Sequence, residues 1–340
     1  MSDQKEVASK INKVVGKIFI NEERELRSGW RVLIFFLLFL LAAILLNTLL
    51  DAIASVFPPV RNLLREPDNE EEASARLVLY YSVGQIANLA AALAASALCA
   101  RLFERRSLAS VGYKLHRGWL RDFALGSLIG AASLALAVGI EAAAGAVRFD
   151  VSTRGGWFLV WAFLFLFFFF LVAAAVEELL FRGFPFQALL HNNGWFVAIA
   201  VTSILFGLAH IDNANASLFS VINTILAGVW LGIAYLMTRS LWLVTALHYS
   251  WNLAMIFIFG LPVSGLKSFS QFAWLRGQAG APVWLTGGDY GPEAGVAVTI
   301  VLIISTAAIW KSRLFAPSED MLEATRHGST AADNPQQHDR

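Results

Sequence analysis

Three short motifs place ionisable and polar side chains inside, or directly beside, long apolar stretches of this chain. The stretch 157–176 contains no charged residue and is followed at once by two glutamates. A charged side chain at the centre of a bilayer costs about 2.5–3.5 kcal/mol on insertion scales, so such residues are functional-site candidates. The candidates are Glu177, Glu178 and Arg182 in EELLFR, His210 in FGLAH, and His248 and Asn252 in HYSWN.

The EELLFR motif combines an ion pair with a carboxylate that has no local partner. On a helix, Glu178 and Arg182 share one face at i, i+4 spacing, so the guanidinium can neutralise Glu178. Glu177 points about 100° away from Glu178. A carboxylate without a local partner is suited to act as a general base that takes a proton from water. The alternative is that the apolar span ends at Val176 and that both glutamates lie among lipid headgroups.

The two histidine motifs each have a structural and a chemical interpretation. A lone histidine in an apolar helix, such as His210, is more often a hydrogen-bonded structural residue, or it marks the end of a span before Asp212. His248 and Asn252 lie four residues apart, about 10 Å inside their span at 1.5 Å per residue. They form either an interhelical polar clamp or a site in which Asn252 orients His248 or donates to an oxyanion.

The composition indicates a polytopic membrane protein. Of 340 residues, 57% are apolar and 15% are charged, and the mean hydropathy is +0.60. Soluble proteins are about 45–50% apolar and about 25% charged. The net charge of +1 reflects basic residues distributed by membrane topology, so we expect no nucleic-acid partner. The single cysteine, Cys99, excludes an intrachain disulfide and a thiolate metal cluster.

We predict an all-α fold, a polytopic bundle of about eight transmembrane helices, because helices satisfy their own backbone groups in lipid. Stretches near the roughly 20 residues needed to cross a bilayer recur along the chain. With a cytoplasmic N-terminus, 19 of the 26 Lys and Arg fall on the cytoplasmic side and 7 on the outer side, which agrees with the positive-inside rule. The predicted spans are 32–57, 77–103, 120–146, 157–180, 195–211, 216–237, 241–260 and 294–312.

Two polar or basic segments flank the predicted membrane domain, 32–312, which holds the motifs within 177–252. Residues 1–31 have a basic amphipathic pattern that suits a helix on an anionic cytoplasmic surface, or alternatively an ordinary cytosolic helix. Residues 313–340 are polar and are predicted to be a disordered cytoplasmic tail. The Gly-rich loop 261–293 is predicted to lie along the outer interface.

If these spans cross the membrane alternately in opposite directions, the motifs are separated. This arrangement puts Glu177 near the cytoplasmic side and His210 near the outer side, so a common site requires a bend. Either the fourth helix continues through Arg182 and breaks at Gly183 and Pro185, or the fifth helix starts deep in the membrane. Irregular backbone at that depth is tolerated where it is buried in protein or lines a water-filled cavity.

Taken in order, the motifs resemble those of the CaaX-protease and bacteriocin-processing family of intramembrane peptidases, also called the Abi family: EExxxR, FxxxH and HxxxN/D. All key positions match across residues 177–252. The resemblance implies an eight-helix endopeptidase similar to the Ras-converting enzyme, which removes the last three residues of prenylated CaaX proteins. It assigns Glu177 to water activation, His210 to orienting the water or polarising the carbonyl, His248 and Asn252 to the oxyanion, and Glu178 and Arg182 to support.

The resemblance leaves metal dependence open, and no cofactor is certain. Two histidines and a glutamate form a known catalytic zinc set, for which Glu177, His210 and His248 are the candidate ligands. In a zinc enzyme of this kind one glutamate binds the metal and the other acts as the base. We favour a metal-free glutamate mechanism, because Asn252 fits an oxyanion donor better than a zinc ligand.

We therefore expect an integral multi-pass protein of a bacterial cytoplasmic (inner) membrane, with both termini in the cytoplasm. Its expected partners are the lipid bilayer and a membrane-associated protein or peptide, whose peptide bond it hydrolyses as a CaaX-protease-like intramembrane endopeptidase. The first rival is a non-catalytic immunity, scaffold or regulatory protein on the same fold, which would tolerate substitution of Glu177. The second is a proton-coupled transporter, since buried glutamate and histidine side chains can relay protons.

Overall fold

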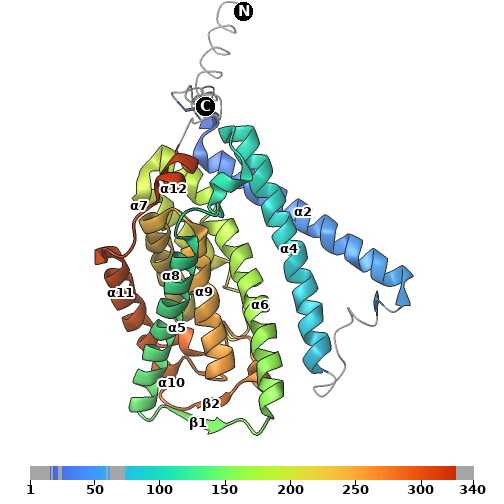
Figure 1. The fold of residues 1–340 in the computed structure, drawn as a ribbon, viewed down its shortest axis with the longest axis vertical. Helices are drawn as coiled ribbons and strands as arrows, with labels where there is room; N and C mark the ends of the chain where they lie inside the picture. Colours follow the sequence, from blue (N-terminus) through green and yellow to red (C-terminus); the bar gives the residue numbers. More distant parts are fainter. Residues whose placement is uncertain (1–15, 17, 22–24, 59, 62–72, 327–340) are drawn as a thin grey trace, which may run out of the picture.

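The computed structural model describes residues 16, 18–21, 25–58, 60–61 and 73–326, which form a helical bundle (Figure 1). The α-helices are α2 (Ser28–Val56), α4 (Ala73–Glu104), α5 (Trp119–Ala143), α6 (Gly156–Phe181), α7 (Phe184–Leu208), α8 (Leu218–Thr238), α9 (Leu241–Leu253), α10 (Val283–Thr286), α11 (Val296–Lys311) and α12 (Glu319–Ala324). The other elements are β1 (Val147–Val151), β2 (Leu275–Ala279), the π-helical turn η2 (Ala254–Ile258), and the 3-10 turns η1 (Leu108–Val111), η3 (Ser270–Phe272), η4 (Gly288–Tyr290) and η5 (Pro292–Ala294).

Six segments of the described chain are long and apolar enough to cross a membrane. One of them, Gly156–Leu208, contains both α6 and α7, and the shorter apolar helix α11 is additional to the six. The predicted polytopic helical bundle is therefore confirmed. The count of eight membrane crossings stays a prediction.

The bundle has two distinct ends (Figure 1). The start of α2 and α12 lie at one end, and β1, β2 and α10 lie at the other. We call the first the terminal face, which includes residues 101–121 and 311–326, and the second the sheet face, which includes residues 209–217 and 260–295. At the sheet face β1 and β2 pair antiparallel, so segments more than 120 residues apart in sequence are joined there.

Close packing of α5 against α9 positions the helix that carries the third motif. A Cβ added to Gly126 would come within 2.6 Å of the Leu243 carbonyl oxygen, and one added to Gly130 would overlap the Leu247 carbonyl and the Ser250 hydroxyl. Small residues at such positions let two membrane helices approach closely. The two glycines therefore set how closely α5 and α9 approach each other.

The Gly130→Ala substitution is expected to lower the thermal unfolding midpoint of the purified protein. The added methyl group must push α5 away from α9, and overpacking of this kind typically costs about 1–3 kcal/mol. Gly139→Ala on the same helix is the matched control, because its Cβ would meet no atom within 4 Å. Equal midpoints for the two variants in a detergent thermal-shift assay would contradict this account of the interface.

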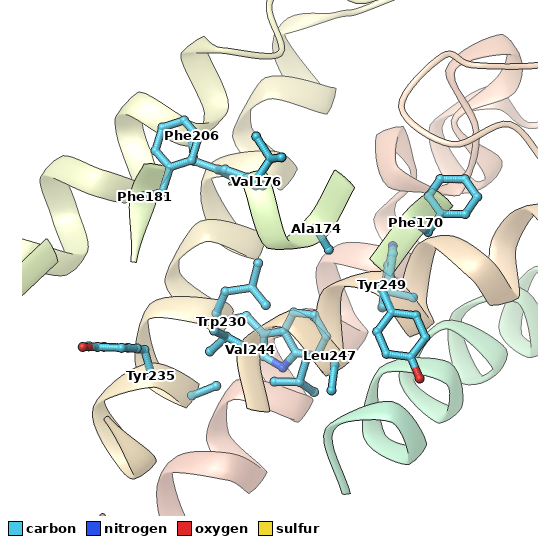
Figure 2. Close-up of a cluster of buried hydrophobic side chains, with 14 of the residues drawn as sticks. Phe170, Ala174, Val176, Phe181, Phe206, Trp230, Tyr235, Val244, Leu247 and Tyr249 are labelled. Carbon is cyan, nitrogen blue, oxygen red and sulfur yellow. The ribbon is translucent and has the colours of Figure 1, made fainter. Parts of the chain in front are cut away.

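The core around α9 is built from several helices (Figure 2). Trp230 of α8 lies beside Val244 and Leu247 of α9, and Ala174 of α6 faces the same cluster. All four side chains are almost fully buried. The three helices that carry or flank the motifs thus share one packed centre.

The chain reverses direction within α7, which resolves the predicted separation of the motifs. α6 continues to Phe181, the chain breaks at Gly183, and α7 starts at Phe184 with a proline in its first turn. Inside α7 the helical dihedral angles are interrupted at Gly194, where φ is 83°. A straight helix would leave Phe206 more than 30 Å from its start at 1.5 Å per residue. The rings of Phe181 and Phe206 are instead 5.2 Å apart, so the second arm of α7 folds back along the first.

The two ends of the chain differ in how much of them the structure describes. Of the predicted disordered tail, 313–340, residues 313–326 are ordered against the terminal face: Phe315 and Met321 are buried, and Ser318 caps α12. Their apolar side chains pack on the bundle, a property that the polar composition hides. Residues 327–340 lie outside the described residues, as does most of the predicted amphipathic segment, namely 1–15, 17 and 22–24.

Candidate active site

A buried ion pair anchors the site at the end of α6. Arg182 Nη1 lies 3.2 Å from Glu178 Oε2 and 3.3 Å from Oε1, and both side chains are completely buried. The pairing follows from the i, i+4 spacing. Arg182 also donates from Nη2 to the Gly228 carbonyl of α8 at 3.0 Å, and its guanidinium lies 4.6 Å from the centre of the Phe206 ring of α7. One guanidinium therefore joins α6, α7 and α8.

Glu178 holds the first histidine. His248 Nδ1 donates to Glu178 Oε1 at 2.8 Å, from α9 to α6. A carboxylate can only accept in this bond, so Nδ1 carries a hydrogen and Nε2 is turned away from Glu178. Glu178 thus connects Arg182 on one side with His248 on the other. This fixes the orientation of the imidazole by a charge-assisted hydrogen bond.

The second histidine is fixed by its own helix. His210 Nδ1 donates to the Phe206 carbonyl at 2.8 Å. Because a carbonyl oxygen only accepts, the hydrogen is again on Nδ1 and Nε2 carries the free lone pair. His210 comes two residues after α7 ends, and the reversal at Gly194 returns it to the level of Phe181 and Glu177.

Glu177 faces both imidazoles without touching either. Its Oε2 lies 3.8 Å from His210 Nε2 and 3.8 Å from His248 Nε2. These distances are too long for direct hydrogen bonds, and Oε2 is buried with no hydrogen-bond partner among the described residues. The Glu177 side chain as a whole is 32% exposed, whereas Glu178 is fully buried. Of the two glutamates, only Glu177 is open to a substrate.

These groups lie on the wall of a cavity of about 540 Å³. Glu177, His210, His248 and Asn252 all line it, so the structure brings these four predicted residues together. Glu178 and Arg182 lie behind them and contact the cavity through His248 and Phe206. The inner part of the wall is apolar and includes Phe170, Leu180, Phe181, Leu231 and Leu302.

Asn252 does not take one of the two roles predicted for it. We expected that Asn252 could orient His248, but Glu178 takes that position through the 2.8 Å hydrogen bond. Asn252 is partly exposed and lines the cavity. Its amide is therefore available to an incoming group, which agrees with the alternative role as a donor.

A second carboxylate on the cavity wall was not found from the sequence. Glu293, in η5, lines the sheet-face part of the wall. Its Oε2 accepts from the Ser264 amide at 2.6 Å and the Ser264 hydroxyl at 2.7 Å, and Oε1 accepts from Trp251 Nε1 at 3.3 Å. Glu293 thus ties the turn at Ser264 to the residue that precedes Asn252. It lies in a loop without a motif, so no sequence pattern identified it.

The three candidate zinc ligands do not form a metal site as they are arranged. In the described part of the chain, no group of three or more His, Cys, Asp or Glu side chains is placed to hold a metal ion. The histidines do show the backbone and carboxylate hydrogen bonds that often orient metal ligands. Those bonds equally orient two imidazoles toward a water molecule.

Comparison with known families identifies the region that contains the site. Residues 159–254 match the family model described as type II CAAX prenyl endopeptidase Rce1-like. The match runs from α6 to the first residue of η2 and includes all six candidate residues. The CaaX-protease assignment that the motifs indicated is thereby supported. Comparisons with curated proteins and with solved structures give no match.

Proposed function

We propose that this chain, with its Rce1-like CaaX endopeptidase domain, hydrolyses a peptide bond of a membrane-associated protein or peptide. The observation that carries the proposal is the position of Glu177 Oε2, which has no hydrogen-bond partner among the described residues and lies 3.8 Å from two imidazole Nε2 atoms at a cavity wall. One water molecule can bridge polar groups at this separation. Oε2 itself is buried, but the Glu177 side chain is 32% exposed, so the geometry supports a water held by the exposed part of the carboxylate beside the two histidines.

Glu177 acts as the general base in this mechanism. Its carboxylate takes one proton from the bridging water while His210 Nε2 accepts a hydrogen bond from the other hydrogen and orients the attack. The water oxygen forms a bond to the scissile carbonyl carbon, and the carbonyl oxygen becomes an oxyanion. Protonated Glu177 then gives its proton to the leaving amine nitrogen as the C–N bond breaks.

His248 and Asn252 stabilise the oxyanion. When His248 is protonated, Glu178 compensates its charge through the 2.8 Å hydrogen bond, and Nε2 can donate to the developing negative charge. The amide of Asn252, on the same cavity wall, supplies a second donor. Donors fixed in advance in a site of low dielectric contribute strongly to catalysis.

The proposal is tested with purified protein in detergent and a set of membrane-anchored reporter peptides, with and without a chelator. We expect cleavage that survives chelation, because the mechanism uses only side chains of this chain. Cleavage lost on chelation and restored by Zn²⁺ would contradict the metal-free mechanism. pH-dependent solute flux in vesicles, without hydrolysis of any reporter, would favour the transporter.

Replacing His210 is expected to lower kcat by about 10²-fold, the lower end of the range for a general acid–base group. His210→Gln removes the Nε2 lone pair that orients the water but keeps a polar side chain. His191→Gln is the matched control, since His191 lies near Arg106 at the terminal face and outside the cavity. Equal loss of activity in the two variants would indicate a general folding defect and not a role of His210 in orienting the water.

We further propose a bacterial cytoplasmic membrane as the location, with both termini in the cytoplasm. The bias of Lys and Arg toward the terminal segments and residues 101–121 supports this orientation. The expected partners remain a polypeptide substrate and the surrounding lipid.

A further inference from the structure

The terminal face gathers most of the basic segments of the chain. Lys114 lies 3.8 Å from Asp320, and Arg121 donates to the Leu314 carbonyl at 2.8 Å. The Trp195 ring, beside the reversal in α7, lies 5.8 Å from that of Trp310. These contacts place residues 101–121, the reversal and the C-terminal segment at one end of the bundle. Residues 101–121 alone carry six Lys and Arg.

The sheet face carries fewer basic residues and holds its own network of loops. Asn213, in the α7–α8 connection, donates to the Ser264 carbonyl at 3.1 Å. Lys267 pairs with Asp289 at 2.6 Å. Because cytoplasmic loops carry the excess of Lys and Arg, the charge distribution assigns the terminal face to the cytoplasm and the sheet face to the opposite side.

The active-site cavity reaches the sheet face and not the terminal face. Its wall includes Asn213 and Ala214 of the α7–α8 connection, the turn 263–266, and Glu293. No lining residue among those described comes from residues 101–121, 183–195 or 311–326. The segment that follows His210 is also polar and exposed, with Asp212 and Asn215 in it. The wall is thus polar toward the sheet face and apolar toward the bilayer centre.

We infer that the cavity opens on the side of the membrane opposite the cytoplasm, and that the substrate is a membrane-anchored polypeptide whose scissile bond lies at the outer leaflet. The substrate class rests on the proposed function, whereas the direction of opening rests only on the fold and the charges. The polar loops at the mouth suit an extended backbone entering from water. The apolar inner wall suits a hydrophobic segment that reaches the site from lipid.

Cysteine labelling tests the direction of opening independently of hydrolysis. Cys99 is the single cysteine of the chain and is buried, so Cys99→Ala gives a background without thiols. Three exposed positions then receive one cysteine each: Asp212→Cys beside the mouth, Ala209→Cys on the cavity wall, and Arg117→Cys at the terminal face. Intact bacterial cells expressing each variant are treated with a membrane-impermeant maleimide, before and after lysis.

We expect Asp212→Cys and Ala209→Cys to be labelled in intact cells and Arg117→Cys only after lysis. The reverse pattern would overturn the inference, and so would labelling of Ala209→Cys only after lysis. A parallel pair of reporters carries the same cleavable sequence on the outer or the cytoplasmic side of one membrane anchor. Preferential cleavage of the outer reporter supports the substrate class, and preferential cleavage of the cytoplasmic reporter overturns it. If the labelling holds and neither reporter is cleaved, the proposed peptidase function fails while the direction of opening stands.

Discussion

The Glu177→Gln variant is expected to lose peptide hydrolysis by about 10²–10⁴-fold, the usual contribution of a general base. Glutamine keeps the size and polarity of the side chain but cannot accept a proton from water at neutral pH. The carboxylate lies beside both imidazoles, with Oε2 3.8 Å from each Nε2 atom. The measurement is kcat on a cleaved reporter peptide, with wild type and variant purified in the same detergent.

The control for this prediction is Asp212→Asn, which removes an exposed carboxylate two residues after His210. Its activity should match the wild type, because Asp212 does not line the cavity. Both variants should unfold at the wild-type temperature. Full activity of Glu177→Gln would exclude Glu177 as the base and favour a non-catalytic protein on this fold.

The Arg182→Met variant is expected to unfold far more easily than the wild type. Both Arg182 and Glu178 are fully buried, so the substitution leaves the carboxylate in a medium of low dielectric with only the hydrogen bond from His248. Removing one partner of a buried pair typically costs about 3–5 kcal/mol. The same change removes the bond to the Gly228 carbonyl and the contact with the Phe206 ring. Denaturant titration in detergent, followed by circular dichroism, measures the loss.

The double variant Glu178→Gln with Arg182→Met distinguishes the effect of the buried charge on stability from the effect of the lost guanidinium contacts. It should recover a large part of the stability lost in Arg182→Met, since the buried charge is gone and the glutamine oxygen can still accept from His248. A double variant that is as unstable as Arg182→Met alone would show that the contacts of the guanidinium with α7 and α8, and not the ion pair, hold the helices together.

The helical character of the fold and one half of the site could be predicted from local spacing. The i, i+4 spacing of Glu178 and Arg182 predicts that they pair. Glu177 points about 100° away from Glu178 on the helix, so it is predicted to stay outside the pair. Runs of apolar residues likewise defined most helices to within a few residues. Each of these inferences depends only on helix geometry within a single segment.

The features that escaped prediction depend on contacts between segments. The fifth predicted span, 195–211, starts directly after Gly194, but only the contact of Phe206 with Phe181 shows that the second arm of α7 folds back along the first. One of the alternatives for Asn252 placed the partner that orients His248 on its own helix, whereas the partner, Glu178, lies on α6. Glu293 is brought to the cavity by a loop that no periodicity describes.

Two helices beside the site are shorter than the membrane is thick. α11 has 16 residues and is about 24 Å long at 1.5 Å per residue, while the second arm of α7 is about 21 Å long. Both start or end at the terminal face, where Trp195 and Trp310 meet, so both stop short of the far side of a hydrocarbon layer about 30 Å thick. Lipid around helices that are too short thins to match them. Hydrolysis consumes one water molecule for each bond broken, and thinner lipid beside these two helices would shorten the path from bulk water to His210.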